Sequence, residues 1–315
     1  MTLASLIRAT SALSLAFALG MPSIAHATDI ASSNGASVNA ASSNGSSPGG
    51  DEKKADATPT PAAQASDADD DTALKPAEPD FTLISLPTSL RLPKYKSAFR
   101  VTHRFTRPLN EGDFGDLSAS LFGIDSGAQI GLEYRFGFMK NAEIGVHRIS
   151  NRDVEFFGQY GLMRQGQKGS PVAVSAAVSI EGQNNFKTSY SPTVGAIVSR
   201  TFGDVAAVYV EPIWVNNSNP LPSLLVDHND TFMVGLGTRI RVRPTVYVVV
   251  EGSPRVSGYR PGVNHMSFAF EKRAGGHMFQ LNFSNSFGTS LNQIANGGPA
   301  NKNWFMGFAI TRKFY

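Results

Sequence analysis

The chain of 315 residues contains no cysteine. This absence excludes a disulfide-stabilised scaffold, a metal site with thiolate ligands and a lipid anchor on an N-terminal cysteine. The chain also lacks any apolar run of the roughly 20 residues that a transmembrane helix needs, which excludes a helical membrane bundle. It does contain 21 Phe, and its mean hydropathy is -0.13, so the chain as a whole is not disordered.

Residues 1–27 have the features of a secretory signal peptide. One charge, Arg8, precedes the apolar run Ala12–Leu19, and Ala25-His26-Ala27 forms an A-x-A cleavage site. The apolar run is much too short for a transmembrane anchor. We therefore predict that the chain is exported and cleaved after Ala27.

Residues 28–80 contain no aromatic residue and consist mostly of Ala, Ser, Asn, Gly, Pro and Asp. Such a composition cannot bury enough apolar surface to offset the entropy lost on ordering, so we predict a disordered low-complexity linker. Residues 51–80 hold nine acidic residues and three lysines, hence a net charge of -6. The acidic stretch is either a solvated spacer or a tail that binds peptidoglycan or a partner protein.

Residues 81–315 carry the remaining charge of +9 and alternate apolar with polar side chains. Within 172–181, for example, Val and Ile alternate with Ala, Ser and Glu, which is the period of a β-strand with one apolar face. Twelve such segments lie near 97–106, 128–137, 141–149, 153–164, 171–181, 190–201, 205–215, 231–243, 245–252, 263–271, 276–285 and 303–315. Their connections are alternately long and short, apart from a short one near 150–151. The fold class that this predicts is all-β, an antiparallel up-and-down transmembrane β-barrel of twelve strands.

Aromatic residues indicate that the apolar face contacts lipid. Those at predicted strand ends are Phe136, Phe138, Phe202, Trp214, Trp304, Phe314 and Tyr315. Membrane barrels collect aromatic side chains where strands leave the hydrocarbon layer. The last segment, with its apolar face and its terminal Phe314-Tyr315, resembles the C-terminal signal of bacterial outer-membrane barrels. We predict an outer-membrane barrel and keep a secreted soluble β domain as the alternative.

Several strings in this region also resemble one protein family. They are Phe99–Phe105 (FRVTHRF), Leu121–Asp125 (LFGID), Leu132–Tyr134 (LEY), Leu162–Gln165 (LMRQ), Tyr209–Pro212 (YVEP) and Gly275–Asn285 (GGHMFQLNFSN). Together they look like the uncharacterised bacterial β-barrel family called domain of unknown function 5777. The resemblance spans nearly the whole predicted barrel and excludes the linker. It implies an exported barrel protein and brings no established activity.

If the apolar face contacts lipid, the other face turns charged residues and two histidines toward the lumen. These candidates are Arg100, Arg104, Glu133, Arg135, Glu143, His147, Glu155, Glu181, Glu211, Arg239, Arg241, Glu251, His265 and Glu271. Buried charges must be paired or hydrated. Two interpretations stay open: a polar pore or pocket that selects a solute, and a network of side chains that closes a narrow lumen.

Threading the strands up and down from a periplasmic N-terminus separates the candidate charges along the barrel. Glu155, Glu181 and Glu251 are expected toward the outer end. Toward the periplasmic end we expect Arg100, Arg135 and Arg241, beside Glu143 and Glu271.

Catalytic and metal sites have weak support in the sequence. No H-x-x-x-H motif occurs, and we predict no metal site and no cofactor. His277, Asn282 and Ser284 share one predicted strand but lie partly on opposite faces, a poor arrangement for a hydrolase. The Gly235-x-Gly237 pair has no helix after it, so we interpret it as strand packing or a close backbone approach and not as a nucleotide loop.

Three functions follow from this reading. The first is an outer-membrane barrel that passively binds or transports a small polar solute. The second is a structural barrel that docks other envelope components without transport, and the third, which we do not favour, is a lipid-modifying enzyme. The expected partners are the lipid bilayer and a small polar solute. No basic cluster supports nucleic-acid binding, and the oligomeric state is left open.

Overall fold

The structure is a computed structural model that describes residues 77–220 and 228–314. The predicted signal peptide, most of the predicted linker and Tyr315 lie outside the described residues. The strands are β1 (Ser97–Phe105), β2 (Ala128–Met139), β3 (Ala142–Ile149), β4 (Val154–Met163), β5 (Ala173–Gly182), β6 (Thr188–Phe202), β7 (Ala206–Asn216), β8 (Asp230–Arg243), β9 (Val246–Ser253), β10 (Arg255–Gly258), β11 (His265–Ala274), β12 (His277–Ser284) and β13 (Phe305–Phe314). Short helices in the connections are α1 (Phe114–Ala119), η1 (Leu121–Ser126), η2 (Gln167–Gly169), α2 (Gln183–Phe186) and α3 (Leu291–Ala295).

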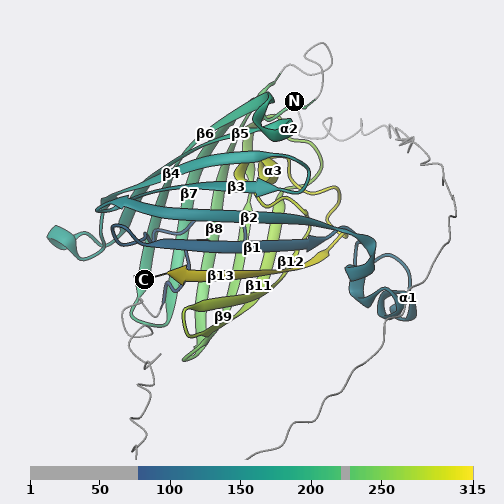
Figure 1. The fold of residues 1–315 in the computed structure, drawn as a ribbon, viewed down its shortest axis with the longest axis horizontal. Helices are drawn as coiled ribbons and strands as arrows, with labels where there is room; N and C mark the ends of the chain where they lie inside the picture. Colours follow the sequence, from purple (N-terminus) through teal and green to yellow (C-terminus); the bar gives the residue numbers. More distant parts are fainter. Residues whose placement is uncertain (1–76, 221–227, 315) are drawn as a thin grey trace, which may run out of the picture. The chain divides into compact units, whose positions relative to one another are not determined.

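All strand pairs are antiparallel, and the sheet closes on itself. Strand β1 pairs with β2 on one side and with β13 on the other (Figure 1). Strand β8 pairs with both β9 and the short β10, and Val234 donates its N–H to the carbonyl of Pro254 between them. Proline cannot donate to the ladder, so β9 and β10 form one wall strand interrupted at Pro254. The predicted closed barrel of twelve strands is confirmed.

The apolar phase of the strands faces outward. On β2, Leu132 and Tyr134 are each 45% exposed, whereas Arg135 is buried. The same pattern recurs on the other strands, and the exposed aromatic residues Phe138, Phe202 and Phe314 lie at strand ends. Among the described residues, no helix is long and apolar enough to cross a membrane. The outer surface therefore has the apolar band that lipid contact requires.

The two ends of the barrel differ in their connections. At the end where β1 begins and β13 finishes, which we call the turn end, the strands are linked by residues 140–141, 203–205, 244–245 and 275–276 and by the longer connection 164–172. The opposite end, which we call the loop end, carries the long connections 106–127, 217–229 and 285–304 (Figure 1). The predicted short connection at 150–153 also lies at the loop end.

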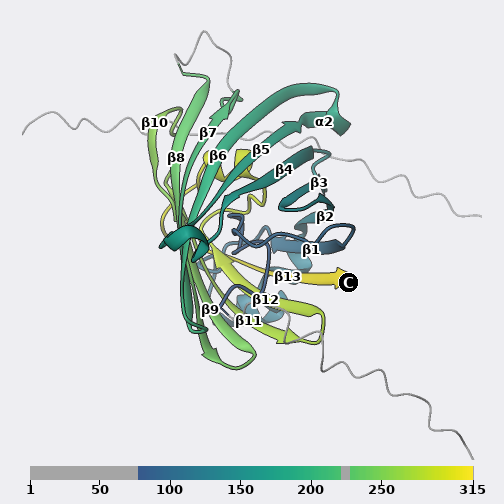
Figure 2. The same cartoon turned by 90° about the vertical axis from the view of Figure 1, so that its left-hand side faces the viewer.

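Residues 77–92, which we call the inner segment, lie inside the barrel (Figure 2). They contact inward side chains from strands on opposite sides of the ring, including Arg135 on β2 and Arg239 on β8. The segment folds back on itself through a bridge between Thr82 and Pro87. Its first four residues, assigned above to the linker, are buried as well.

A hydrophobic core forms between the inner segment and one side of the wall. Leu83, Ile84 and Leu86 are buried against inward apolar residues of β6 to β9 and β11. Leu86 approaches Gly235 and Leu83 approaches Gly237, where any Cβ would collide with them. The glycine pair is therefore a place of close contact, but the contact is made by leucine side chains of the inner segment and not by another backbone.

The outward phase can be tested by placing a charge on the lipid side of β2. Leu132→Arg should lower the free energy of unfolding in lipid vesicles by about 2–4 kcal/mol, because an arginine near the bilayer midplane is costly. Phe138→Arg, on the same strand but at its end, should cost at most about 1 kcal/mol. Equal losses for the two variants would contradict the proposed membrane position of β2.

Candidate functional site

The lumen is the candidate site, and the structure buries most of the residues that the sequence analysis assigned to it. Twelve of the fourteen candidates are buried: Arg100, Arg104, Arg135, Glu143, His147, Glu155, Glu181, Glu211, Arg239, Glu251, His265 and Glu271. Glu133 and Arg241 are partly buried. Arg241 donates to the carbonyl of Pro244 at the turn end and forms no ion pair in the described part of the chain.

Two arginines form ion pairs with lumenal glutamates. Arg239 binds Glu271 through Nε at 2.8 Å and Nη2 at 3.0 Å, the two-point geometry that a guanidinium and a carboxylate favour. Arg135 pairs with Glu133 and, at 2.7 Å, with Glu143. The expected proximity of Arg135 to Glu143 is confirmed. Glu271 pairs with Arg239 and not with Arg241, whose Nε donates to the carbonyl of Pro244 instead.

Strand register sets five of the candidates in one row across the wall. Arg100 is the direct cross-strand partner of Glu133, Glu133 of His147, His147 of Glu155, and Glu155 of Glu181. The row therefore begins with a guanidinium and ends with two adjacent carboxylates. Threading the strands placed Arg100 and Glu155 toward opposite ends of the barrel and did not predict this row. The row depends on the register between strands, which threading does not include.

The carboxylate of Glu251 holds the inner segment at its bend. It accepts the backbone N–H groups of Ile84 at 2.9 Å, Ser85 at 2.9 Å and Leu86 at 3.2 Å. Nε2 of His265 and the hydroxyl of Ser267 also form hydrogen bonds with Oε1 of Glu251. Three backbone N–H groups therefore share one carboxylate acceptor at this bend.

Other wall side chains satisfy the remaining backbone groups of the inner segment. Arg100 donates to the carbonyl of Ile84, Arg239 to that of Thr82, Gln280 to that of Leu83 and Gln159 to that of Thr88. Leu92 donates its N–H to Glu143 at 3.0 Å. The segment adds no strand to the wall. It is bound by side chains, as a ligand would be.

The connection 285–304 covers the lumen at the loop end. Arg104 donates to the carbonyls of Ser286 at 3.0 Å and Gly288 at 2.8 Å, and Asn292 of α3 donates to Glu181 at 2.8 Å. Asp153, in the β3–β4 connection, accepts from Gln293. Burial raises the pKa of the Asp153 carboxyl, against the lowering effect of its hydrogen bonds. The lumen is therefore filled from both ends.

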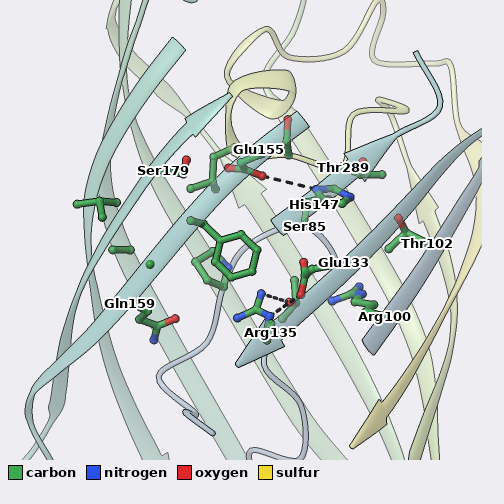
Figure 3. A pocket seen from close by; sticks show the side chains of 18 of the residues that line it. Ser85, Arg100, Thr102, Glu133, Arg135, His147, Glu155, Gln159, Ser179 and Thr289 are labelled. Carbon is green, nitrogen blue, oxygen red and sulfur yellow. Dashed lines mark hydrogen bonds and ion pairs between the residues drawn. The ribbon is translucent and has the colours of Figure 1, made fainter. Parts of the chain in front are cut away.

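A cavity of about 60 Å³ remains between the inner segment, the connection 285–304 and strands β1 to β5 (Figure 3). Its polar lining includes Arg100, Thr102, Glu133, His147, Glu155 and Ser179. A space of this size accommodates a few water molecules or a small solute.

The contacts of His265 do not form a catalytic relay. In a triad the histidine uses one ring nitrogen for the nucleophile and the other for the carboxylate. Here Ser267 and Glu251 both contact Nε2 of His265, at 3.1 Å each. His265 and Ser267 are both buried. Within 77–220 and 228–314, no three His, Asp or Glu side chains are grouped so as to hold a metal ion.

His277 and Ser284 also remain apart from any such relay. His277 accepts from Arg312 near the turn end, whereas Ser284 is buried and accepts from the N–H of Ser286 at the loop end. His103 stacks on Phe308 at a ring distance of 4.9 Å. His103 and His277 thus contact an aromatic ring and an arginine, and neither contacts a serine hydroxyl in the described part of the chain.

The sequence analysis missed the inner segment, which decides the state of the lumen. The available signal was the group of apolar residues Phe81, Leu83, Ile84 and Leu86, which follows the acidic stretch and does not alternate like a strand. It also missed the apolar inward face of β6 to β9, since charged residues alone were sought in that phase.

Comparisons with known proteins agree with the barrel. A family profile named DUF5777 and described as a membrane bound beta barrel domain matches residues 80–314. No curated protein matches the sequence.

The comparison with solved structures gives matches at low sequence identity. The NanC porin is 7% identical, with 70% of this chain and 99% of that chain covered and a TM-score of 0.43. Outer membrane phospholipase A from Escherichia coli is 10% identical, with 76% and 98% covered and a TM-score of 0.42. A mutant of Rh. blastica porin is 10% identical, with a TM-score of 0.31. The matched region covers 59% of this chain and 55% of that porin.

The buried pair of Arg239 and Glu271 gives a direct test of the lumenal network. Glu271→Gln should lower the free energy of unfolding in detergent or lipid by about 3–5 kcal/mol, because it leaves a buried guanidinium without its counterion. Arg241→Gln, on the same strand as Arg239 but partly exposed, should change it by no more than about 0.5 kcal/mol. Unfolding followed by tryptophan fluorescence measures both variants. A loss for Glu271→Gln as small as that for Arg241→Gln would contradict the pairing.

Proposed function

Because the chain belongs to the DUF5777 family of membrane-bound beta-barrel domains, we propose that it is an outer-membrane barrel whose passage for small polar solutes is closed by its own inner segment. The turn end faces the periplasm in this proposal, since Pro79 and Asp80, at the start of the inner segment, contact Lys313 and Thr311 there. The protein acts as a gated channel and not as an enzyme. Solutes pass when residues 77–92 leave the lumen.

The observation that carries this proposal is the way in which the inner segment is held. Side chains of the wall bind its backbone, through Glu251, Glu143, Arg239 and Gln280. Each such contact contributes modestly in net terms because water replaces it when it breaks. A wall with these charges is also stable when hydrated, as the wall of an open polar channel is. Release of the segment therefore leaves a usable pore.

A second function is supported by the core around the segment. Leu83, Ile84 and Leu86 bury apolar surface against Ile213, Met233 and Val249, and this surface becomes hydrated on release. If that burial dominates, the barrel is closed permanently and serves as a structural or partner-docking component of the envelope. Conductance distinguishes the two functions.

The proposed opening can be measured in planar lipid bilayers. Glu251→Gln removes the charged acceptor of three backbone N–H groups, and a loss of about 1.4 kcal/mol in closure corresponds to a tenfold increase in the open population. We expect rare openings for the unaltered protein and at least about tenfold more for Glu251→Gln. Glu211→Gln is the matched control, because Glu211 is a buried lumenal carboxylate with no hydrogen bond to the inner segment.

A reversible lock ties the openings to the inner segment. Ser89 and Ser199 lie with their Oγ atoms 2.7 Å apart, and the chain has no cysteine of its own. Adding Ser89→Cys and Ser199→Cys to Glu251→Gln should abolish the openings under oxidising conditions, and a reductant should restore them. If Glu251→Gln and a barrel lacking residues 77–92 both fold, as judged by heat-modifiable migration, and neither conducts, the permanently closed barrel is the correct function.

A further inference from the structure

The cavity beside the inner segment contains buried polar atoms without partners. In the described part of the chain, Nε and Nη1 of Arg100, Nε2 of His147 and the hydroxyls of Thr102 and Ser179 have no hydrogen-bond partner. All four residues line the cavity, and Figure 3 shows them around its edge. Buried polar groups of native proteins are nearly always paired, so these atoms indicate an occupant.

Glycine makes room for this occupant on the wall. Gly131 is the cross-strand partner of Thr102 on β1, and a Cβ at this position would collide with Thr102 Oγ1 and with Nε2 of His147 on β3. A larger residue would fill the space that these two polar atoms face. The wall sequence thus keeps the cavity open where its unpartnered groups meet.

The charges around the cavity are separated by sign. Arg100 lies at one side of the row, with two donors free, while Glu133 next to it pairs with Arg135. Glu155 lies at the other side, 3.6 Å from Nδ1 of His147, and Glu181 is directly opposite it. The first side therefore has guanidinium donors without an acceptor, and the second side has two carboxylates that form no ion pair with a lysine or arginine of the described residues.

We propose that the cavity binds a small zwitterion, with its anionic group at Arg100 and its cationic group at Glu155. The cross-strand positions of Arg100 and Glu155 are three strand spacings apart, about 14 Å between Cα atoms, and both side chains extend inward from a curved wall. The gap between the charged groups favours a ligand whose charges are separated by several bonds, such as an ω-amino acid. Thr102 and Ser179 hydrogen-bond to it along its length.

This proposal rests on the proposed function only in treating the ligand as the solute that the barrel handles. The site is complete in the closed barrel, so binding is measured without any conductance. A barrel that never conducts but binds the zwitterion supports the site and refutes the channel. A barrel that conducts but does not bind the zwitterion supports the channel and refutes the site.

Calorimetry on the purified full chain in detergent tests the site with γ-aminobutyrate as the probe. Butyrate lacks the cationic group, butylamine lacks the anionic group, and 1,4-butanediol lacks both. We expect saturable binding of γ-aminobutyrate and at least about tenfold weaker binding of the three analogues. Glycine, with its charges closer together, should also bind more weakly than γ-aminobutyrate.

Two variants assign the ends of the ligand. Arg100→Gln should remove the preference for γ-aminobutyrate over butylamine, and Glu155→Gln should remove its preference over butyrate. Arg100 also holds Ile84, so heat-modifiable migration and the melting temperature verify that each variant is folded. Glu211→Gln, a buried lumenal carboxylate outside the cavity lining, should leave all affinities unchanged. Gly131→Val should abolish binding by filling the cavity.

Three outcomes would overturn the proposal. The first is a folded protein that binds none of the amino acids, which would mean that the cavity holds water. The second is equal binding of butylamine, which would identify a simple cation site. The third is equal binding of 1,4-butanediol, which would assign recognition to the hydroxyls alone.

Discussion

The need to pair every backbone polar group in an apolar surrounding is the constraint from which this structure follows. A strand edge exposed to lipid leaves N–H and C=O groups without partners, so a membrane sheet must close on itself. In this chain the closure is made by β1 and β13. A ring of twelve strands then encloses a lumen, and the inward side chains need partners of their own. The inner segment and the connection 285–304 provide them.

The two sides of the lumen meet this need in different ways. Along β6 to β9 the inward residues are largely apolar and pack on Leu83, Ile84 and Leu86. Along β1 to β5 they are charged or hydroxylated and leave a cavity. Glu251 on β9 binds the bend of the inner segment and also contacts the polar residues His265 and Ser267 on β11. One carboxylate thus links the apolar contact of the segment to the polar wall.

Much of the fold could be predicted because it depends on a local period. Alternation at every second residue separates Leu132 and Tyr134, which face outward, from the inward Glu133, whatever the neighbouring strand is. The inward phase likewise identified Arg239, Glu251 and Glu271 as buried charges. Their partners were not predictable, since a pair such as Arg239 and Glu271 joins residues on strands that are not adjacent.

The sequence by itself determined the number of strands, the outward face and the set of lumenal charges, because each depends on spacing along one strand. Only the tertiary structure decided the register that aligns Arg100, Glu133, His147, Glu155 and Glu181, and the occupation of the lumen by residues 77–92. Both depend on contacts between segments far apart in the chain. No local pattern encodes such contacts, since the apolar residues of the inner segment acquire their partners only after the ring has closed.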